Sequence, residues 1–320
     1  MPSPPPIKRH NLDELTLGEA ILTWEQIHTG FESSSGWMHS GIAVLGDDSL
    51  VIAHPEGRQL IRVDQEGNSS LIPTDLTEMH CIAGARHRSG QVLWIADNGH
   101  RFVYGEPTYG EVRAPGRAVA LTLDGTVAQE LQDPQINGPW SPTSVAVVES
   151  GNPDSDLWVA DGYGQNLVHR YSAQGRLLQT IDGTATGKHF DCPHGVWIRG
   201  NNESAEVYVA DRANRRLVGA DALNSPSSMV DLHGYLFVTE LFGALAVFDG
   251  DDYIGHWGSS SRNPQDPIWP NRYDDAGQTV APPLHDRTFN SPHGITTHNG
   301  DLYLTEWLIG GRIIRLHRSE

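Results

Sequence analysis

The chain has 320 residues, and its 40 acidic side chains outnumber its 22 basic ones, which gives a formal net charge of −18. This charge disfavours nucleic acids and anionic membranes as partners, because the field of the protein would repel both. The N-terminus lacks the basic start and apolar core of a signal peptide, and no apolar run approaches the ~20 residues that a membrane helix needs. We therefore expect a soluble, cytoplasmic protein with no nucleic-acid or membrane partner.

The chain begins with a proline-rich segment that shows no strand or helix pattern. Residues 1–17 are predicted to be a flexible N-terminal tail, and residues 18–320 a single domain, because no linker divides them. The first strand pattern covers residues 19–27 and stands ahead of any repeat. We expect this strand to close a ring by supplying the outer strand of the last repeat.

A repeated unit then recurs along the chain, and such self-similarity indicates the architecture better than any single motif. Each unit has an inner strand, a second strand that usually ends in an acid, and often a third strand after a polar turn. Period-two alternation without a convincing amphipathic helix favours three to four antiparallel strands per unit. The predicted fold is all-β, a six-bladed β-propeller, in which radial repetition hides most sheet edges. Its inner strands are expected to begin at Ser40, His80, Thr143, His194, Ser228 and His293, with the copy at Ser228 the weakest.

Of two long connections, residues 104–115 are rich in Gly and Pro, and residues 258–286 are rich in Gly, Pro, Asn and Asp. We expect them to form loops over one face of the propeller, where recognition usually lies. Cys81 and Cys192 are the only cysteines. Two free thiols are the simpler interpretation, although one disulfide stays open.

Three of the 16 histidines occupy equivalent places in the repeat: His80, His194 and His293. They fall in the second, fourth and sixth units, so they should point at a common axis from evenly spaced blades. Three neutral imidazoles with one open position are typical of a catalytic zinc site. The alternative is a Pro-His-Gly turn whose histidine only bonds a neighbouring blade.

Two further histidines and the recurrent acids are weaker candidates. His39 lies one residue before the equivalent position, where a role behind the ligands or at the surface is favoured over ligation, and it is also a candidate to bind substrate. His54 replaces the recurrent acid and is a candidate to face substrate. The acids that end the second strands recur in nearly every unit, which favours structural bonds to turn N–H groups over catalysis. These acids are Asp97, Asp161, Asp211, Glu240 and Glu306.

The chain resembles the NHL-repeat propeller of peptidyl-α-hydroxyglycine α-amidating lyase from about Gly36 to the C-terminus. The stretches that carry the resemblance are residues 141–147 with 158–163, Pro193-His194 with 209–216, and residues 289–293. The resemblance implies a catalytic zinc ion on His80, His194 and His293. It also implies that Tyr163, in an Asp-Gly-Tyr motif, removes the substrate hydroxyl proton.

The same resemblance suggests the arginines that would hold the substrate. Arg212 matches a family arginine near the site, whereas Arg58 matches only if its loop is rearranged. Three positions depart from the family: Ser291 replaces a methionine, Gly294 an acid that binds calcium, and Gly164 a disulfide cysteine. A structural Ca²⁺ is therefore not expected, and the pocket wall should differ.

These observations predict a metal-dependent carbon–nitrogen lyase, similar to peptidylamidoglycolate lyase, that cleaves an α-hydroxylated amide or carbinolamide. Its partner would be a small-molecule or peptide substrate. One alternative is a metal-dependent hydrolase, hydratase or isomerase acting on another small molecule. Another is a non-catalytic NHL propeller that binds a protein or peptide.

Overall fold

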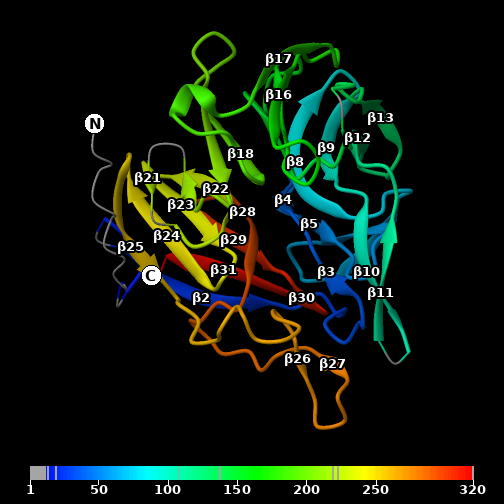
Figure 1. Ribbon diagram of the computed structural model, residues 1–320, viewed down its shortest axis with the longest axis vertical. Coiled ribbons are helices and arrows are strands. Elements are labelled where there is room, and N and C mark those ends of the chain that lie inside the picture. Colours follow the sequence, from blue (N-terminus) through cyan, green and yellow to red (C-terminus); the bar gives the residue numbers. More distant parts are fainter. Residues whose placement is uncertain are drawn as a thin grey trace.

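Five four-stranded sheets and one five-stranded sheet form the blades of a β-propeller in the computed structural model (Figure 1). The structure describes residue 12 and residues 14–18, 20–106, 108–136, 138–217, 220–221 and 223–318. Each inner strand contacts the inner strand of the next blade, and β28 contacts β4, so the ring of six blades closes. The all-β, six-bladed prediction is therefore confirmed.

Every blade is an antiparallel sheet of consecutive strands, except where a hairpin is inserted or the ring closes. Blade 1 contains β4 (Ile42–Val44), β5 (Leu50–Ala53), β6 (Gln59–Val63) and β7 (Ser69–Pro73); blade 2 contains β8 (Met79–His87), β9 (Gly90–Asp97), β12 (Arg117–Thr122) and β13 (Val127–Glu130). Blade 3 contains β14 (Ser144–Val147), β15 (Leu157–Asp161), β16 (Leu167–Tyr171) and β17 (Leu177–Ile181); blade 4 contains β18 (Pro193–Arg199), β19 (Glu206–Asp211), β20 (Arg216–Leu217) and β21 (Ala220–Asp221). Blade 5 contains β22 (Pro226–Leu232), β23 (Tyr235–Glu240), β24 (Ala244–Asp249) and β25 (Asp252–Trp257); blade 6 contains β28 (Pro292–His298), β29 (Asp301–Glu306), β31 (Arg312–Arg318) and β2 (Ala20–Ile27).

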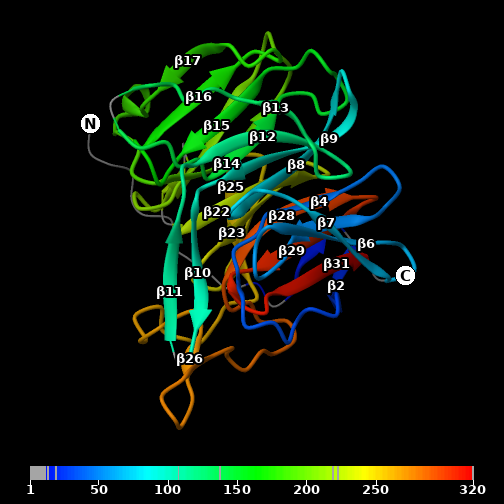
Figure 2. The ribbon, with the colours of Figure 1, turned by 90° about the vertical axis from the view of Figure 1, so that its right-hand side faces the viewer.

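The ring is closed by a strand from the start of the chain, as predicted. β2 pairs antiparallel with β31 and is preceded by the short β1 (Thr16–Leu17). Figures 1 and 2 show blue β2 beside red β31. Most of the predicted tail, residues 1–11 and 13, lies outside the described residues, but Leu15 is buried in the core. The packed part of the chain thus begins before residue 18.

The hydrophobic core lies between blades. Six clusters of buried side chains each join two adjacent blades, such as Leu93 and Ile95 of blade 2 against Val51 and Leu60 of blade 1. Alternate residues of each strand face opposite neighbours, which is why the period-two pattern predicted the strands. The relative position of adjacent blades is therefore set by side-chain packing on both faces of every sheet.

The acids that end the second strands are structural, as predicted. The Asp97 carboxylate accepts N–H bonds from Thr77, Glu78 and Gly99 at 2.8–2.9 Å. The other four acids likewise accept backbone N–H groups, and Glu306 also pairs with buried Arg312. Each acid thereby fixes the segment that leads into the inner strand of its own blade.

Two hairpins project beyond the blades at the same end of the molecule (Figures 1 and 2). The prediction of a loop at residues 104–115 is wrong for most of its length, because β10 (His100–Gly105) pairs with β11 (Thr108–Arg113). Its glycines and prolines indicated a loop, and its mostly exposed strands lack the buried–exposed alternation that marks the blade strands. The second connection, 258–286, is mainly irregular and holds the short β26 (Arg272–Tyr273) and β27 (Thr279–Val280).

The remaining elements are small. β3 (Trp37–Met38) pairs with β30 (Leu308–Ile309), and the one helix among the described residues is a 3₁₀ turn, Thr184–Thr186. No helix in this part of the chain is long and apolar enough to cross a membrane. Cys81 and Cys192 are free thiols, as the simpler interpretation held.

Candidate metal centre

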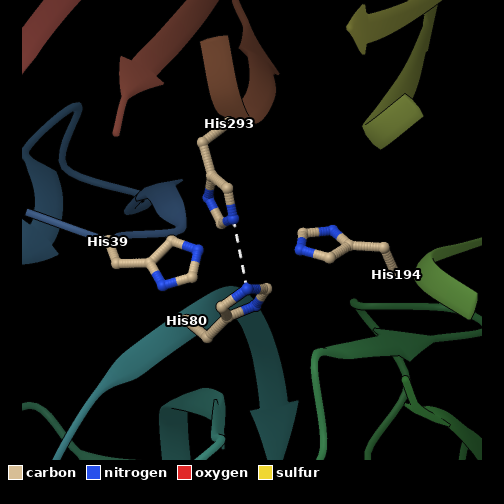
Figure 3. Close-up of side chains that lie close together, drawn as sticks. All are labelled: His39, His80, His194 and His293. Carbon is tan, nitrogen blue, oxygen red and sulfur yellow. Dashed lines mark hydrogen bonds between the residues drawn. The ribbon is translucent and has the colours of Figure 1, made fainter. Parts of the chain in front are cut away.

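His80, His194 and His293 each lie at a β-bulge near the start of an inner strand. In blade 2, for example, pairing passes from Met79 to Cys81 and skips His80, and the ladders of blades 4 and 6 also shift at the histidine. A bulge re-aims the side chain that it leaves unpaired. The three imidazoles are 99% buried by this means and converge where the inner strands meet (Figure 3).

One ring nitrogen of each imidazole is held by the neighbouring blade. The Nδ1 atoms lie at hydrogen-bond distance from backbone carbonyl oxygens: His80 from Thr143 at 2.5 Å, His194 from Ser227 at 3.1 Å and His293 from Ser40 at 3.1 Å. A neutral imidazole that donates from Nδ1 carries its lone pair on Nε2, as metal-binding histidines do. The sequence left open the alternative that each histidine only bonds a neighbouring blade. That bond occupies Nδ1 and leaves Nε2 available to a metal ion.

The Nε2 atoms are brought together on the axis. His293 Nε2 lies 3.2 Å from His80 Nε2, and His194 Nε2 lies 3.1 Å from the Tyr163 hydroxyl oxygen. With both Nδ1 atoms donating, the Nε2 atoms of His80 and His293 face each other with lone pairs, an arrangement that a cation stabilises. With His39, the ligand atoms of the four histidines all lie within 4.8 Å of one another. This donor set fits a metal ion.

The protonation state also suits a metal. Burial is the main cause that lowers the pKa of each of the three histidines, and the charge of Arg212 adds to it. For His80 and His194 the neighbouring histidines add to it as well. For His293 the pKa falls to about 3. Because these imidazoles are neutral at ordinary pH, they are in the form that binds metal ions.

Tyr163 and Arg212 flank this centre. Arg212 donates from Nη1 to the Tyr163 hydroxyl oxygen at 3.1 Å and from Nη2 to Ser227 Oγ at 2.9 Å. Tyr163 keeps 37% of its surface exposed at the mouth. Burial of its hydroxyl end raises the pKa of Tyr163 to about 12, and the positive charge of Arg212 opposes that rise. Sequence reasoning therefore selected two residues that the fold does bring to the histidines.

His39 belongs to the centre more closely than its sequence position indicated. Its ring centroid lies 4.3 Å from that of His80 and 4.4 Å from that of His293. Its Nδ1 is 3.5 Å from Oε1 of buried Glu78. Burial raises the pKa of Glu78, and the charge of nearby Arg101, itself 8% exposed, opposes the rise.

Sequence reasoning missed Glu78 and Arg101. Glu78 could have been found, since an acid two residues before a candidate ligand is a natural partner for another imidazole. Arg101 had no such signal, because it belongs to the inserted hairpin and not to the repeat. Its guanidinium lies against Gly57, where a Cβ would come within 2.1 Å of Nη1.

His54 and Arg58 were predicted to bind substrate, and the structure places them in the loop between β5 and β6. The His54 ring contacts Phe31, and its Nδ1 accepts the Glu56 N–H. Arg58 is exposed and adopts a positive φ of 58°. Neither belongs to the group of four histidines, and their roles in binding stay predictions.

Two positions that depart from the amidating lyases are tightly enclosed. Ser291 is fully buried, and its hydroxyl donates to the Trp307 carbonyl at 2.6 Å. At Gly294 a Cβ would lie 2.8 Å from Thr305 Oγ1 and 2.9 Å from the Ser40 carbonyl oxygen. No acidic side chain could stand at position 294 without displacing blade 1.

Aromatic rings form a wall beside His39. Trp307 lies 5.2 Å from the His39 ring and 5.4 Å from Trp37, which stacks on Phe102 of β10 at 4.6 Å. A cavity of about 560 Å³ opens on another side, next to Tyr163, with Asn98 and Arg113 among its lining residues. The centre therefore lies between an aromatic surface and a cavity lined by both polar and apolar groups, with room for a small organic molecule.

Comparison with known proteins supports the fold. No protein-family profile and no curated protein matches the sequence. Among solved structures, the chain is similar to a streptogramin B lyase, with a TM-score of 0.51 and 14% identity over 93% of this chain and 98% of that one. It is also similar to a gluconolactonase from Xanthomonas campestris, with a TM-score of 0.52 and 14% identity over 95% and 91% of the two chains. A third match is BBS1N, solved in complex with ARL6DN, with a TM-score of 0.52 and 12% identity over 92% and 96%.

These similarities show that the fold is a β-propeller. At such low sequence identity a shared fold does not show a shared function. The matched structures include enzymes and a protein solved in complex with a partner. Function must therefore be argued from the centre itself.

Proposed function

We propose that this propeller is a metal-dependent carbon–nitrogen lyase that acts on an N-acyl hemiaminal, R–CO–NH–CH(OH)–R′, in the manner of amidating lyases. The observation that carries the proposal is the Tyr163 hydroxyl, which lies 3.1 Å from both His194 Nε2 and Arg212 Nη1. A group able to exchange protons thus stands at the edge of a cation site. Buried hydroxyls in such positions are candidates for general acid–base catalysis.

The reaction needs only the movement of one proton between two atoms of the substrate. The hydroxyl loses its proton as its oxygen forms the carbonyl double bond, the C–N bond breaks, and the nitrogen gains a proton. The products are an amide, R–CO–NH₂, and an aldehyde, OHC–R′. Tyr163, in its ionised form, takes the hydroxyl proton and returns one to nitrogen, so the residue is unchanged after each turnover.

Burial works against this role, because it raises the pKa of Tyr163 to about 12, and the charge of Arg212 opposes that rise. Arg212 favours the ionised phenol by its charge and fixes the oxygen by its hydrogen bond, while Ser227 Oγ holds the other end of the guanidinium. His80, His194 and His293 would hold a divalent metal ion, which when bound supplies positive charge that favours the deprotonated hydroxyl of the substrate. Zinc is the ion that the family resemblance suggests. The cavity beside Tyr163 offers space for the acyl part of the substrate.

A direct assay tests the reaction. Metal-loaded protein incubated with an N-acyl-α-hydroxyglycine should release glyoxylate and the corresponding amide in equal amounts. Tyr163→Phe should lower the rate by about 10²- to 10⁴-fold, the usual contribution of a positioned acid–base group. Its metal content should not change, because the phenol is not needed to hold the ion.

Tyr273→Phe is the matched control, since Tyr273 is 51% exposed on β26. If metal-loaded protein releases no glyoxylate, the lyase proposal fails and a hydrolase, hydratase or isomerase at the same centre becomes the better interpretation. The enclosed Ser291 and Gly294, which differ from the family, favour that rival. If the protein binds no metal at all, a non-catalytic binding propeller is favoured instead.

A further inference from the structure

His39 stands outside the repeat register and yet points into the centre. It lies just before β4 of blade 1, and its side chain is only 12% exposed. Figure 3 shows its ring aimed at the other three imidazoles from a side that none of them occupies. Edge-to-face contacts with His80 and His293 and a ring contact with Trp307 keep it there.

Like the three other histidines, His39 has an oxygen atom facing its Nδ1, but the kind of oxygen differs. Each of the three places Nδ1 against a backbone carbonyl oxygen of the next blade. His39 places Nδ1 3.5 Å from a carboxylate oxygen of Glu78, whose side chain is 7% exposed. Carboxylates and backbone carbonyls are both common partners that orient a metal-binding histidine through its second ring nitrogen. An Nδ1–H directed at Glu78 leaves the lone pair on Nε2, on the side of the centre.

Glu78 is itself held in place. Its backbone N–H donates to the Asp97 carboxylate at 2.9 Å, and the neighbouring Thr77 N–H donates to the same carboxylate at 2.8 Å. The guanidinium of Arg101 acts on Glu78 with opposite charge from the inserted hairpin. A buried carboxylate is costly unless it has partners, because burial removes its hydration. Arg101 and the His39 Nδ1 are the partners that Glu78 has here.

The four ligand atoms are also close enough for one ion. All lie within 4.8 Å of one another. Two nitrogens on opposite sides of an ion, each at a bond length of about 2.1 Å, are about 4.2 Å apart. Small side-chain movements would therefore bring all four into contact with a single ion.

We propose that His39 is a fourth protein ligand of the metal and that Glu78 is the residue that positions it. This inference rests on the metal centre of the proposed function but not on the reaction. Four imidazoles fill a tetrahedral shell, so substrate can reach the ion only if it accepts a fifth or sixth ligand. The centre is thus suited to ions that take octahedral geometry, such as Mn²⁺, Fe²⁺, Co²⁺ or Ni²⁺, rather than to tetrahedral Zn²⁺.

Cobalt substitution tests this on the intact protein. Co²⁺ in a site of five or six ligands absorbs visible light weakly, whereas tetrahedral Co²⁺ absorbs strongly. The wild-type Co²⁺ protein should show the weak bands. A strong tetrahedral spectrum would overturn the inference that the ion takes a fifth or sixth ligand, while the assignment of His39 and Glu78 is decided by the variants below.

Variants then identify the ligands through Co²⁺ affinity, measured by competition with a chelator. His39→Gln should weaken affinity and change the absorption spectrum. Glu78→Gln should weaken affinity by about 10- to 100-fold, as expected for a positioning residue. The exposed His233→Gln and Glu149→Gln are the controls and should bind as the wild type does. Unchanged affinity in both His39→Gln and Glu78→Gln would refute the assignment.

The test of the four-histidine centre can fail independently of the test of the lyase reaction. Weakened Co²⁺ affinity in His39→Gln and Glu78→Gln, with no glyoxylate release from the wild type, would leave the four-histidine centre standing and end the lyase proposal. Unchanged Co²⁺ affinity in both variants, with glyoxylate release, would do the reverse. A protein that binds no Co²⁺ would end both.

Discussion

The even-numbered and odd-numbered blades contribute different halves of the same centre. Blades 2, 4 and 6 supply the three imidazoles that follow the repeat, and blades 3, 5 and 1 supply the carbonyl oxygens of Thr143, Ser227 and Ser40 that face their Nδ1 atoms. The two sets have the same architecture and the same kind of packed interface. What differs is one residue at the start of the inner strand.

This division teaches that the centre depends on how adjacent blades are placed, and not on any one blade. An imidazole is correctly aimed only while the next blade holds its other nitrogen. Each blade interface is also one of the six core clusters, so packing and ligand orientation are coupled. A change that disturbs either of the two blades that form an interface should therefore lower metal affinity. The size of the loss should depend on which blade is changed.

Removing an even-blade imidazole should have the largest effect. His194→Ala deletes a ligand and leaves the Ser227 carbonyl without its partner. Metal affinity should fall by more than the ~10- to 100-fold that changes behind a ligand cause. The increase in melting temperature on adding metal should disappear with it. His233→Ala, in an exposed turn, serves as control, and equal affinity in the two variants would contradict the assignment.

A substitution that displaces an odd blade from its even neighbour should have the next largest effect on metal binding. A Cβ at Gly195 would come within 2.2 Å of the Ser227 carbonyl oxygen, which is the acceptor for His194. Gly195→Ala should destabilise the fold by roughly 1–3 kcal/mol, the usual cost of overpacking. It should also weaken metal binding. Denaturant unfolding and metal titration would check both.

Gly151→Ala is a suitable control for that variant, since no heavy atom lies within 4 Å of its added Cβ. A Gly195→Ala protein with wild-type stability and wild-type metal affinity would show that the blade interface yields easily. The coupling between packing and ligand orientation would then be absent.

A buried histidine in an odd blade sharpens the comparison. His169 of β16 is fully buried, and its Nδ1 lies 2.9 Å from Thr180 Oγ1. It does not belong to the group of four histidines at the centre. Burial lowers its pKa to about 4. Because the unfolded chain binds this proton more tightly, stability is present above the ordinary histidine pKa of about 6.5 and is lost as pH falls toward 4.

The expected loss from His169 is about 2 kcal/mol between pH 7 and pH 5. His169→Gln should flatten that part of the stability profile, as measured by urea unfolding at several pH values. The difference between wild type and variant should not depend on metal. An equal pH slope in both proteins would show that His169 does not control acid sensitivity.

The smallest effect is expected from an odd-blade side chain whose carbonyl stays in place. Thr143 Oγ1 donates to the Pro193 carbonyl at 3.0 Å, and its backbone oxygen faces His80. Thr143→Val should cost about 1 kcal/mol of unfolding free energy, the typical net value of one hydrogen bond. Metal affinity should not change. A clear loss of affinity would show that the side chain, and not only the backbone, orients the imidazole.

The sequence predicted those features that repeat. The six inner strands, the ring-closing strand at residues 19–27 and the three histidines all follow from a period that recurs along the chain. The acids after the second strands were correctly given structural roles for the same reason. Tyr163 and Arg212 came from a family resemblance, and the fold places both beside His194.

The features that the sequence did not predict are those outside the repeat. His39 is one residue out of register, and Glu78 and Arg101 meet it only because blade 1, blade 2 and the inserted hairpin come together in three dimensions. The hairpin β10–β11 was taken for a loop, since its mostly exposed residues lack the alternation of the blade strands. Irregular elements bring residues together through tertiary packing, which a local pattern does not encode.

Closure of the ring by β2 has a consequence for the order in which the protein assembles. His293 and its acceptor Ser40 are 253 residues apart, and the strand that seals their blade comes from the other end of the described chain. During synthesis, His80 and His194 emerge long before His293, so a growing chain holds only part of the donor set. Contacts between such distant residues also form slowly. A divalent ion therefore finds its full set of ligands only in a molecule that has finished folding, and metal uptake would report the moment of closure.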